Sequence, residues 1–442
     1  EMLGLFLICN ENYFLIKYIS LCFFRNKNND RRGVRIYMKA VEIKNISKIF
    51  GNKSQVDQAK QLLNQGKTKE EIVEASGATV GVNQASFDIY EGETFVVMGL
   101  SGSGKSTLLR MINRLIEPST GDIKIMGESI IQADKAQLRE MRRNKVNMVF
   151  QNFGLFPHKT ILENTEFGLE IKGINGEERR QRAEKALENA GLISYKDQLP
   201  NQLSGGMQQR VGLARALAND PDILLMDEAF SALDPLIRRD MQDELVELQK
   251  RDKRTIVFIT HDLDEALRIG DRIALMKDGQ VVQISSGEDI LMNPASGYVE
   301  RFVEHVDPAK VFTAEHAMQK PEATVRLGKD GARVAARRMQ ANDYDYLLVV
   351  DDQDRLVGYV TDSDMAQLIR KNPDVQLLHL SDHIHKDMPT VGPETPIKEM
   401  YDLMHQAKMP ITVLDDEDHL LGIISRRMII EVLAGEGGGL ND

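Results

Sequence analysis

The chain has 442 residues, of which 42% are hydrophobic and 28% are charged, and its formal net charge is −11. This length suits two or three domains, and this composition excludes disordered and membrane-embedded chains. The acidic balance and the lack of a basic tract argue against a nucleic-acid partner. Both cysteines, Cys9 and Cys22, precede Met38, so the rest of the chain cannot form a disulfide framework and fits a reducing compartment.

Residues 1–37 are an N-terminal segment whose apolar runs are interrupted by polar residues. No run approaches the roughly 20 residues that a spanning helix needs, and the segment lacks the order of a cleaved signal peptide. It could be a membrane-surface anchor, an ordered extra element, or an extension translated ahead of a natural start at Met38. We favour the extension, lying outside the fold.

Residues 38–305 alternate apolar strand-like runs with helical periods, which predicts an α/β domain. The runs are nearly continuous, as in parallel strands that are buried on both faces. An insertion after the first strand reads as two short helices, the second opened by Thr68 with Glu71 three residues later, a capping box. We expect strands at residues 39–50, 94–99, 146–151, 222–228 and 254–260.

The C-terminal part contains an internal repeat, because residues 346–361 align without gaps to residues 410–425. Each copy reads as a strand, an acidic turn, a strand and a helix that begins at a hydroxyl residue. We expect a pseudo-symmetric pair in which each half covers the other's apolar face. The predicted repeats span 310–372 and 383–434, and a flexible tail follows at 435–442.

The stretch GLSGSGKST at residues 99–107 follows a predicted strand and opens a helix, as a Walker A phosphate loop requires. Gly102 and Gly104 let backbone N–H groups close around phosphate oxygens at a helix N-terminus. Lys105 should reach the β- and γ-phosphates, and the Ser106 hydroxyl should bind Mg²⁺. The alternative, a glycine-rich turn without a ligand, is disfavoured by the strand–turn–helix context.

A second motif, ILLMDE at residues 223–228, is a buried strand that ends in two carboxylates. Asp227 would hold Mg²⁺, directly or through water. Glu228 would polarise the attacking water, a contribution of ~10²–10⁴-fold. Gln151 and His261 follow two further strands and should face the same edge of the sheet. His261 could contact the γ-phosphate, and Gln151 could bridge Mg²⁺, water and a moving segment.

These motifs, together with LSGGMQQR at 203–210 and SALD at 231–234, resemble the ATP-binding-cassette (ABC) ATPases over residues 40–305. The resemblance implies a P-loop NTPase cassette with a helical subdomain. It also implies that Glu228 is the catalytic base, His261 the switch histidine and Gln151 the Q-loop glutamine. Phe50 matches the aromatic residue that stacks on adenine, although the helical insertion lengthens the usual gap before the phosphate loop.

In this family the signature LSGGMQQR lies too far from its own phosphate loop to touch the same ATP, so two copies must face each other head to tail. Ser204, Gly205 and Gly206 would then close over the partner's γ-phosphate, with Asp234 near the same seam. We expect Mg²⁺ at Ser106, Gln151 and Asp227. We expect ATP to contact Phe50, Ser101, Gly102, Ser103, Gly104, Lys105, Ser106, Thr107, Gln151, Ser204, Gly205, Gly206, Gln208, Asp234 and His261.

The resemblance is closer to the osmoprotectant-uptake branch, whose ATPase subunits import glycine betaine, proline, carnitine or choline and carry a tandem CBS (cystathionine-β-synthase-type) module. It implies an integral membrane permease, an external substrate-binding protein or domain, and a peripheral place at the cytoplasmic face of the cell membrane. Residues 152–164, just after Gln151, are the expected permease-docking region. One alternative is a soluble cassette that acts on nucleic acid or ribosomes, which the acidic charge and the single cassette disfavour. The other is a regulatory nucleotide-binding protein whose cassette is a passive clamp, which the intact Glu228 disfavours.

In related CBS modules a hydroxyl followed three residues later by Asp often holds a nucleotide ribose. The first repeat offers Thr361 and Asp364, whereas the second has Ser425 with Met428 in place of the acid. We therefore expect one conventional adenosine pocket per chain at most, for cyclic di-AMP or another adenine nucleotide. Ionic strength is another possible input, and a purely structural dimerisation role is the alternative.

Overall fold

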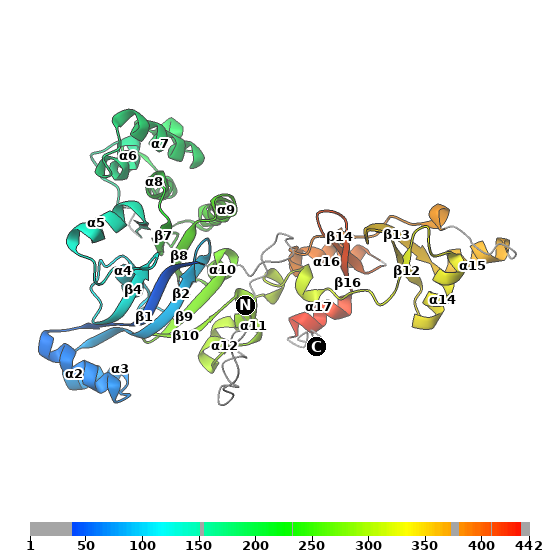
Figure 1. Cartoon of the computed structure of the whole chain (residues 1–442), viewed down its shortest axis with the longest axis horizontal. Helices are drawn as coiled ribbons and strands as arrows, with labels where there is room; N and C mark the ends of the chain where they lie inside the picture. Colours follow the sequence, from blue (N-terminus) through cyan, green and yellow to red (C-terminus); the bar gives the residue numbers. More distant parts are fainter. Residues whose placement is uncertain (1–37, 151–153, 232, 373–379, 408, 435–442) are drawn as a thin grey trace, which may run out of the picture. The chain divides into compact units, whose positions relative to one another are not determined.

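The structure, a computed structural model, describes residues 38–150, 154–231, 233–372, 380–407 and 409–434 (Figure 1). The predicted N-terminal extension (1–37), the predicted tail (435–442) and Gln151 lie outside these residues. No helix within the described ranges combines the length and the apolar character that crossing a membrane requires.

One sheet of the cassette, with four strands in the described residues, is antiparallel and has the order β2-β1-β4-β5. Strands β1 and β2 form a long hairpin, and the predicted insertion is a pair of helices at its tip. The predicted capping box is confirmed, because the Thr68 side chain accepts a hydrogen bond from the Glu71 amide. The elements are β1 (Lys39–Phe50), α2 (Lys53–Asn64), α3 (Lys69–Ser76), β2 (Thr79–Tyr90), β4 (Thr120–Ile125) and β5 (Glu128–Ser129).

The other sheet has six strands in the described residues, in the order β10-β9-β3-β8-β7-β6, and only the edge strand β10 runs antiparallel. Strands β3, β7 and β8 are buried along their whole length, as their continuous apolar character predicts. The strands are β3 (Thr94–Met98), β6 (Val146–Val149), β7 (Ile223–Asp227), β8 (Thr255–Thr260), β9 (Arg272–Lys277) and β10 (Gln280–Ser285).

Two apolar cores hold this sheet in place. One core joins one face of the sheet to helix α4 (Lys105–Ile112) and the antiparallel sheet, through residues such as Leu108 and Leu225. The other core covers the opposite face, with residues such as Leu224 and Met226. Further elements of the cassette are α5 (Lys135–Asn144), α9 (Pro235–Asp252), α10 (Leu263–Ile269), α11 (Gly287–Met292) and α12 (Gly297–Val303).

The predicted helical subdomain is present and has a core of its own. Helices α6 (Ile161–Ile171), α7 (Gly176–Asn189) and α8 (Gly205–Ala218) enclose an apolar cluster with Leu169, Leu187 and Val211 at its centre. Short 3₁₀ turns at Ile193–Tyr195 and Pro200–Gln202 lead into α8.

The repeat forms two small α/β units, each with a three-stranded sheet over its described residues. Each unit has its own core, and the units exchange their leading segments instead of simply covering each other's apolar faces. Gln319, which precedes the first unit's strands, bridges to Ile423, and His385, which precedes the second, bridges to Tyr359. The first unit has β11 (Thr324–Arg326), α14 (Ala332–Asn342), β12 (Tyr346–Val350), β13 (Leu356–Thr361) and α15 (Asp362–Lys371). The second has β14 (Thr390–Val391), α16 (Ile397–Gln406), β15 (Ile411–Leu414), β16 (Leu420–Ile424) and α17 (Arg426–Leu433), with η3 (Pro308–Lys310) and α13 (Ala314–Ala317) leading in.

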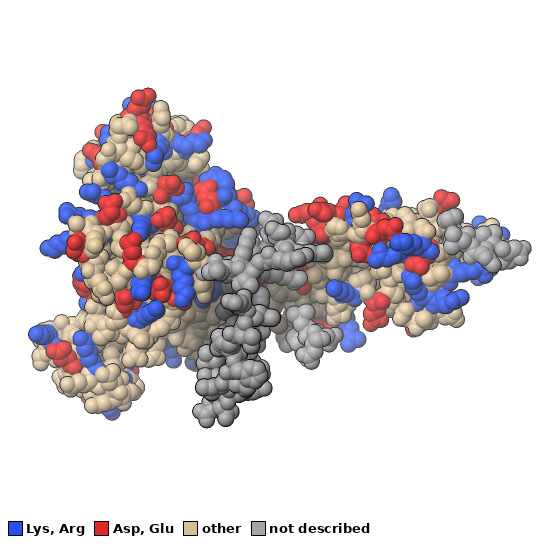
Figure 2. All heavy atoms as spheres, in the orientation of Figure 1, with Lys and Arg blue, Asp and Glu red and all other residues tan. Residues whose placement is uncertain are grey.

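Charged side chains of both signs are interspersed over the face drawn in Figure 2. One charged group is instead buried inside the cassette. Glu93, whose side chain is 11% exposed, accepts a hydrogen bond from the Tyr90 amide at 2.7 Å and pairs with Arg272 at 3.3 Å. Burial raises the pKa of Glu93 from 4.5 to about 7, against the opposing effects of Arg272 and the Tyr90 amide.

This pKa predicts that stability falls as the pH rises. Below pH 4.5 the folded and unfolded chains both carry the Glu93 proton, so the group costs nothing there. Between 4.5 and about 7 only the folded chain keeps it, so unfolding is favoured progressively, by roughly 3 kcal/mol in all. The thermal midpoint of the wild type should therefore decrease more between pH 5 and 8 than that of Glu93→Gln. The exposed neighbour Glu91 supplies the control substitution Glu91→Gln, and equal pH slopes in all three proteins would contradict the prediction.

Candidate functional site

The phosphate loop connects β3 to α4, and two of its glycines have no room for a side chain. At Gly99 a Cβ atom would lie 2.3 Å from the Met276 carbonyl oxygen, and at Gly104, where φ is 100°, it would lie 2.2 Å from the Gly81 carbonyl oxygen. The loop is thus pressed between β9 and β2, with its backbone in a conformation that glycine adopts without strain.

Lys105 folds back across this loop. Its Nζ donates to the carbonyl oxygens of Gly99 (2.8 Å) and Leu100 (3.1 Å). Burial lowers the pKa of Lys105, while the carboxylates of Glu228 and Asp227 act in the opposite direction. The structure therefore holds this cation at the loop, near the predicted catalytic base Glu228 and the predicted Mg²⁺ ligand Asp227.

Ser106 and Asp227, both predicted to bind Mg²⁺, are in direct contact. The Ser106 hydroxyl donates to Asp227 Oδ1 at 2.8 Å, and Arg110 from the next turn of α4 donates to Oδ2 at 3.0 Å. Hydroxyl and carboxylate oxygens suit Mg²⁺, which commonly takes one or two protein ligands and completes its shell with water and phosphate. Consistent with so few ligands, the described part of the chain contains no cluster of three or more His, Cys, Asp or Glu residues for a metal.

Glu228 and His261 also meet at this edge, because β7 and β8 are adjacent parallel strands. Glu228 directly follows β7 and has a left-handed backbone, with φ of 46°. His261 follows β8, and its Nδ1 lies 3.7 Å from Glu228 Oε1. A non-glycine residue in this conformation is uncommon and is often found at functional sites.

Phe50 lies close to the phosphate-loop helix in spite of the insertion. Its Cε2 would be 2.7 Å from a Cβ on Gly81, and Thr107 Cγ2 would be 3.5 Å from the same point. The hairpin register pairs Phe50 with Thr79, so the two inserted helices project from the hairpin and do not separate Phe50 from the phosphate loop. The ring is 41% exposed, with Lys48 Nζ 5.1 Å from its centre.

The signature segment belongs to a different core from the phosphate loop. Ser204 caps α8 by accepting from the Met207 amide, and Gln208 Nε2 donates to the Leu203 carbonyl oxygen at 3.1 Å. Its neighbour is the start of α9, which Asp234 caps by accepting from the Leu236 amide at 3.1 Å. A Cβ on Gly206 would lie 2.7 Å from Ile237 Cγ2, so the signature touches the first turn of α9, which follows the SALD segment, within one chain.

The remaining phosphate-loop predictions concern Ser101, Gly102 and Ser103. Ser101 and Gly102 are exposed, whereas Ser103 is buried and its carbonyl oxygen accepts from the Gly279 amide at 3.1 Å. Gln151 lies outside the described residues, as do Asn152 and Phe153 at the start of the expected docking region.

The described part of that docking region is held by a residue that the sequence analysis missed. Asn164 is fully buried in α6, accepts from the Phe156 amide at 2.8 Å, and donates to the carbonyl oxygens of Phe156, Lys159 and Thr160. The Phe156 ring packs on Phe167, with ring centres 4.6 Å apart. An asparagine among the buried positions of an apolar helix was the available signal for this role.

In the first CBS repeat the structure brings Thr361 and Asp364 together. Thr361 caps α15, and its hydroxyl donates to Asp364 Oδ2 at 2.5 Å. His385, which the sequence analysis missed, contacts the same oxygen through Nε2 at 2.8 Å and stacks on Tyr359. The Thr361 hydroxyl, and then His385, lower the pKa of Asp364 against burial. In the second repeat Ser425 caps α17 by accepting from the Met428 amide.

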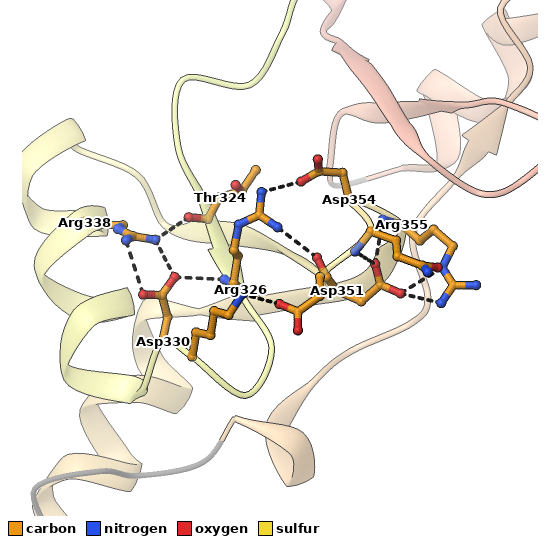
Figure 3. Close-up of polar contacts among 10 residues, drawn as sticks. Thr324, Arg326, Asp330, Arg338, Asp351, Asp354 and Arg355 are labelled. Carbon is orange, nitrogen blue, oxygen red and sulfur yellow. Dashed lines mark hydrogen bonds and ion pairs between the residues drawn. The ribbon is translucent and has the colours of Figure 1, made fainter. Parts of the chain in front are cut away.

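The acidic turns of the two repeats are structural. Arg326 donates to Asp354 at 2.6 Å and to the Asp351 carbonyl oxygen, and Arg355 pairs with Asp351 (Figure 3). The turns are joined by exchanged backbone hydrogen bonds, from the Leu356 amide to the Asp418 carbonyl oxygen and from the Leu420 amide to the Asp354 carbonyl oxygen. These contacts give Asp351 and Asp354 of the first turn a structural role.

Comparison with known proteins agrees with this geometry. The family model described as ABC transporter matches residues 82–231, and the CBS domain model matches residues 314–371 and 380–435. The glycine betaine transport ATP-binding protein OpuAA of Bacillus subtilis (strain 168) is 54% identical over 401 residues, which cover 91% of this chain and 94% of that protein.

Two further relatives are similar over a comparable extent. The glycine betaine/carnitine transport ATP-binding protein GbuA of Listeria monocytogenes is 52% identical, with 91% of this chain and 100% of that protein covered. The glycine betaine/proline betaine transport system ATP-binding protein ProV of Salmonella typhimurium is 48% identical, with 90% and 98% covered. The chain therefore belongs to the family of ABC transporter ATP-binding subunits that contains these glycine betaine transport proteins, and its cassette is followed by a pair of CBS domains.

Proposed function

We propose that this chain is the ATP-hydrolysing subunit that powers import of a quaternary-amine compatible solute such as glycine betaine. One observation carries the proposal. A single sheet edge gathers Lys105, Ser106, Asp227, Glu228 and His261, in a chain whose relatives at 48–54% identity are named for glycine betaine transport.

The residues divide the chemistry among them. The loop amides and Lys105 bind the β- and γ-phosphates, and the exposed ring of Phe50 stacks on the adenine. Ser106 and Asp227 hold Mg²⁺, which supplies positive charge that neutralises the phosphates. Glu228 takes up the proton of the attacking water, and His261, 3.7 Å away, orients Glu228 and contacts the γ-phosphate. Gln151 would be a further Mg²⁺ ligand in this site.

ATP would be enclosed between two copies of the chain, as in other ABC cassettes. Ser204 and the amides of Gly205 and Gly206 would close over the partner's γ-phosphate, with Gln208 and Asp234 beside them. The contact of Gly206 with Ile237 supports this idea, because it links the signature to the segment expected at the seam. Leu236, in the same segment, is 76% exposed and is available for the partner.

Further partners follow from the family. A permease subunit would dock at the described part of the docking region, where Asn164 fixes a half-exposed turn around Phe156. An external substrate-binding protein or domain would deliver the solute, and the cassette would lie at the cytoplasmic face of the membrane. In the CBS pair, Thr361 and Asp364 would hold the ribose of an adenine nucleotide, with cyclic di-AMP as one candidate, and the bound nucleotide would regulate transport.

The role of Glu228 is tested by Glu228→Gln. The amide keeps the size of the side chain but cannot take a proton, so we expect ATP turnover to fall by at least about 10²-fold. ATP binding should persist, and the two-fold ATP-bound dimer should accumulate. Turnover is measured by phosphate release and dimer formation by light scattering. Asp240→Asn, an exposed carboxylate on α9, is the control, and unchanged turnover in Glu228→Gln would rule out the assigned mechanism.

The composite site is tested by mixing two inactive variants. Lys105→Ala disables the phosphate loop and Ser204→Arg blocks the signature, so each protein alone should hydrolyse ATP at background rate. A mixed pair combines the intact loop of one chain with the intact signature of the other. Random pairing should restore about a quarter of wild-type turnover, since half of the pairs are mixed and each has one of two sites intact. A mixture as inactive as its parents would show that each chain closes its own site.

The CBS site is tested by isothermal titration calorimetry with cyclic di-AMP and with AMP. Asp364→Asn removes the carboxylate that would accept ribose hydroxyls, so binding of the active ligand should be lost. The matched control is Ser425→Ala in the second repeat, which lacks the acid and should bind as the wild type does. Binding that survives Asp364→Asn would overturn the assigned pocket, whereas heat from neither ligand with the wild type would favour a structural role for the module.

A further inference from the structure

The end of β9 and the turn that follows it contact both ends of the phosphate loop. At one end of the loop, the Met276 carbonyl oxygen in β9 occupies the position that a side chain on Gly99 would need. At the other end, the Gly279 amide in the turn donates to the Ser103 carbonyl oxygen at 3.1 Å. The position of the loop therefore depends on the position of this strand end and its turn.

Tyr298, on helix α12, also contacts the Met276 carbonyl oxygen. Its hydroxyl donates to the Met276 carbonyl oxygen at 3.4 Å. Burial raises the pKa of Tyr298, and the Leu100 backbone acts against this. The Met276 carbonyl oxygen lies against Gly99, and the Gly99 carbonyl oxygen accepts from Lys105 Nζ at 2.8 Å. The Tyr298 hydroxyl is thus connected through Met276 and Gly99 to the lysine that would bind phosphate.

The ring of Tyr298 contacts two further side chains. Lys277 Nζ lies 5.1 Å from the ring centre, and the Phe302 ring lies 5.7 Å away on the next turn of α12. Val299 is fully buried, and Phe302 packs against the core of the cassette. Because Tyr298 is part of α12, a shift of this helix would move the residue that carries the hydroxyl.

Helix α12 is also the last helix of the cassette before the CBS pair. It ends at Val303, and the chain reaches η3 at Pro308. From η3 onward the chain is built into the module, since Ala309 and Phe312 belong to the core of the second CBS repeat. A change in the packing of that repeat would act on α12 through the few residues between them, and on the neighbouring α11 through Leu291, which packs against the same core.

We propose that Tyr298 is a positioning residue for the phosphate loop and that helix α12 couples the loop to the CBS pair. The inference rests on the proposed function, in that this loop must bind ATP. The Tyr298 hydroxyl holds Met276, and through it Gly99, in the arrangement that presents Lys105 to the phosphates. Because coupling is reciprocal, ATP bound at the loop must also stabilise α12 and the residues that follow it.

The positioning role is tested by Tyr298→Phe, which removes only the hydroxyl, and by Tyr298→Leu, which removes the ring. We expect the Kd for a fluorescent ATP analogue, and the KM for ATP, to rise about 3–10-fold in Tyr298→Phe, the range expected for one hydrogen bond. The kcat at saturating ATP and the thermal midpoint should stay near wild type, since Glu228 and His261 are untouched. Tyr195→Phe, in the helical subdomain, is the matched control.

The outcomes separate this inference from the proposed function. If the wild type binds no ATP, the proposed function fails. If the wild type binds ATP and both Tyr298 variants bind it equally well, only the positioning role is overturned. A fall in kcat without a change in KM would also contradict it.

The coupling is tested by hydrogen–deuterium exchange on the full chain. In the wild type, MgATP should slow exchange in residues 297–307 as well as in the phosphate loop. In Tyr298→Phe at saturating MgATP, the loop should still be protected while residues 297–307 exchange as they do without nucleotide. The coupling would be overturned if MgATP did not change exchange in residues 297–307 of the wild type, or if these residues stayed protected in Tyr298→Phe.

Discussion

The hydrogen bond from the Ser106 hydroxyl to the Asp227 carboxylate joins the two halves of the ATP site, and the rest of the site depends on it. Ser106 is on α4 and Asp227 ends β7, and Leu109 and Leu225 from these elements share one core. The packing of that core fixes both ends of the bond. Closely packed interiors deform little, so the spacing of the two proposed Mg²⁺ ligands is set by the sheet and not by the loops alone.

Most of the cassette could be predicted because its signals are local. The phosphate loop needs glycines where the chain passes close to Met276 and Gly81, and a buried strand beside it needs a continuous apolar run. Parallel strands bring their carboxyl ends to one edge, so the meeting of Asp227, Glu228 and His261 followed from strand order. The roles assigned to these residues come from the family resemblance, and the geometry is compatible with them.

The parts that could not be predicted depend on contacts between distant segments. The nearness of Phe50 to Thr107 requires the register of the β1–β2 hairpin, which the inserted helices conceal. His385 reaches Asp364 only because the CBS repeats exchange their leading segments, and a repeat alignment does not reveal an exchange. Tyr298 lies in no motif, and only its contact with Met276 in the folded chain indicates a role at the phosphate loop.

The exchange of segments within the CBS pair would give the proposed regulation a physical path. His385, at the candidate nucleotide site of the first repeat, belongs to the segment that leads into the second repeat, and its carbonyl oxygen packs against Gly358. The second repeat in turn encloses Ala309 and Phe312, which follow α12. On the proposed function, a nucleotide that displaces His385 from Asp364 disturbs the second repeat first and the phosphate loop afterwards. This order follows from the chain topology. The first repeat is nearer to the cassette in sequence, but the segment that follows α12 packs in the core of the second repeat.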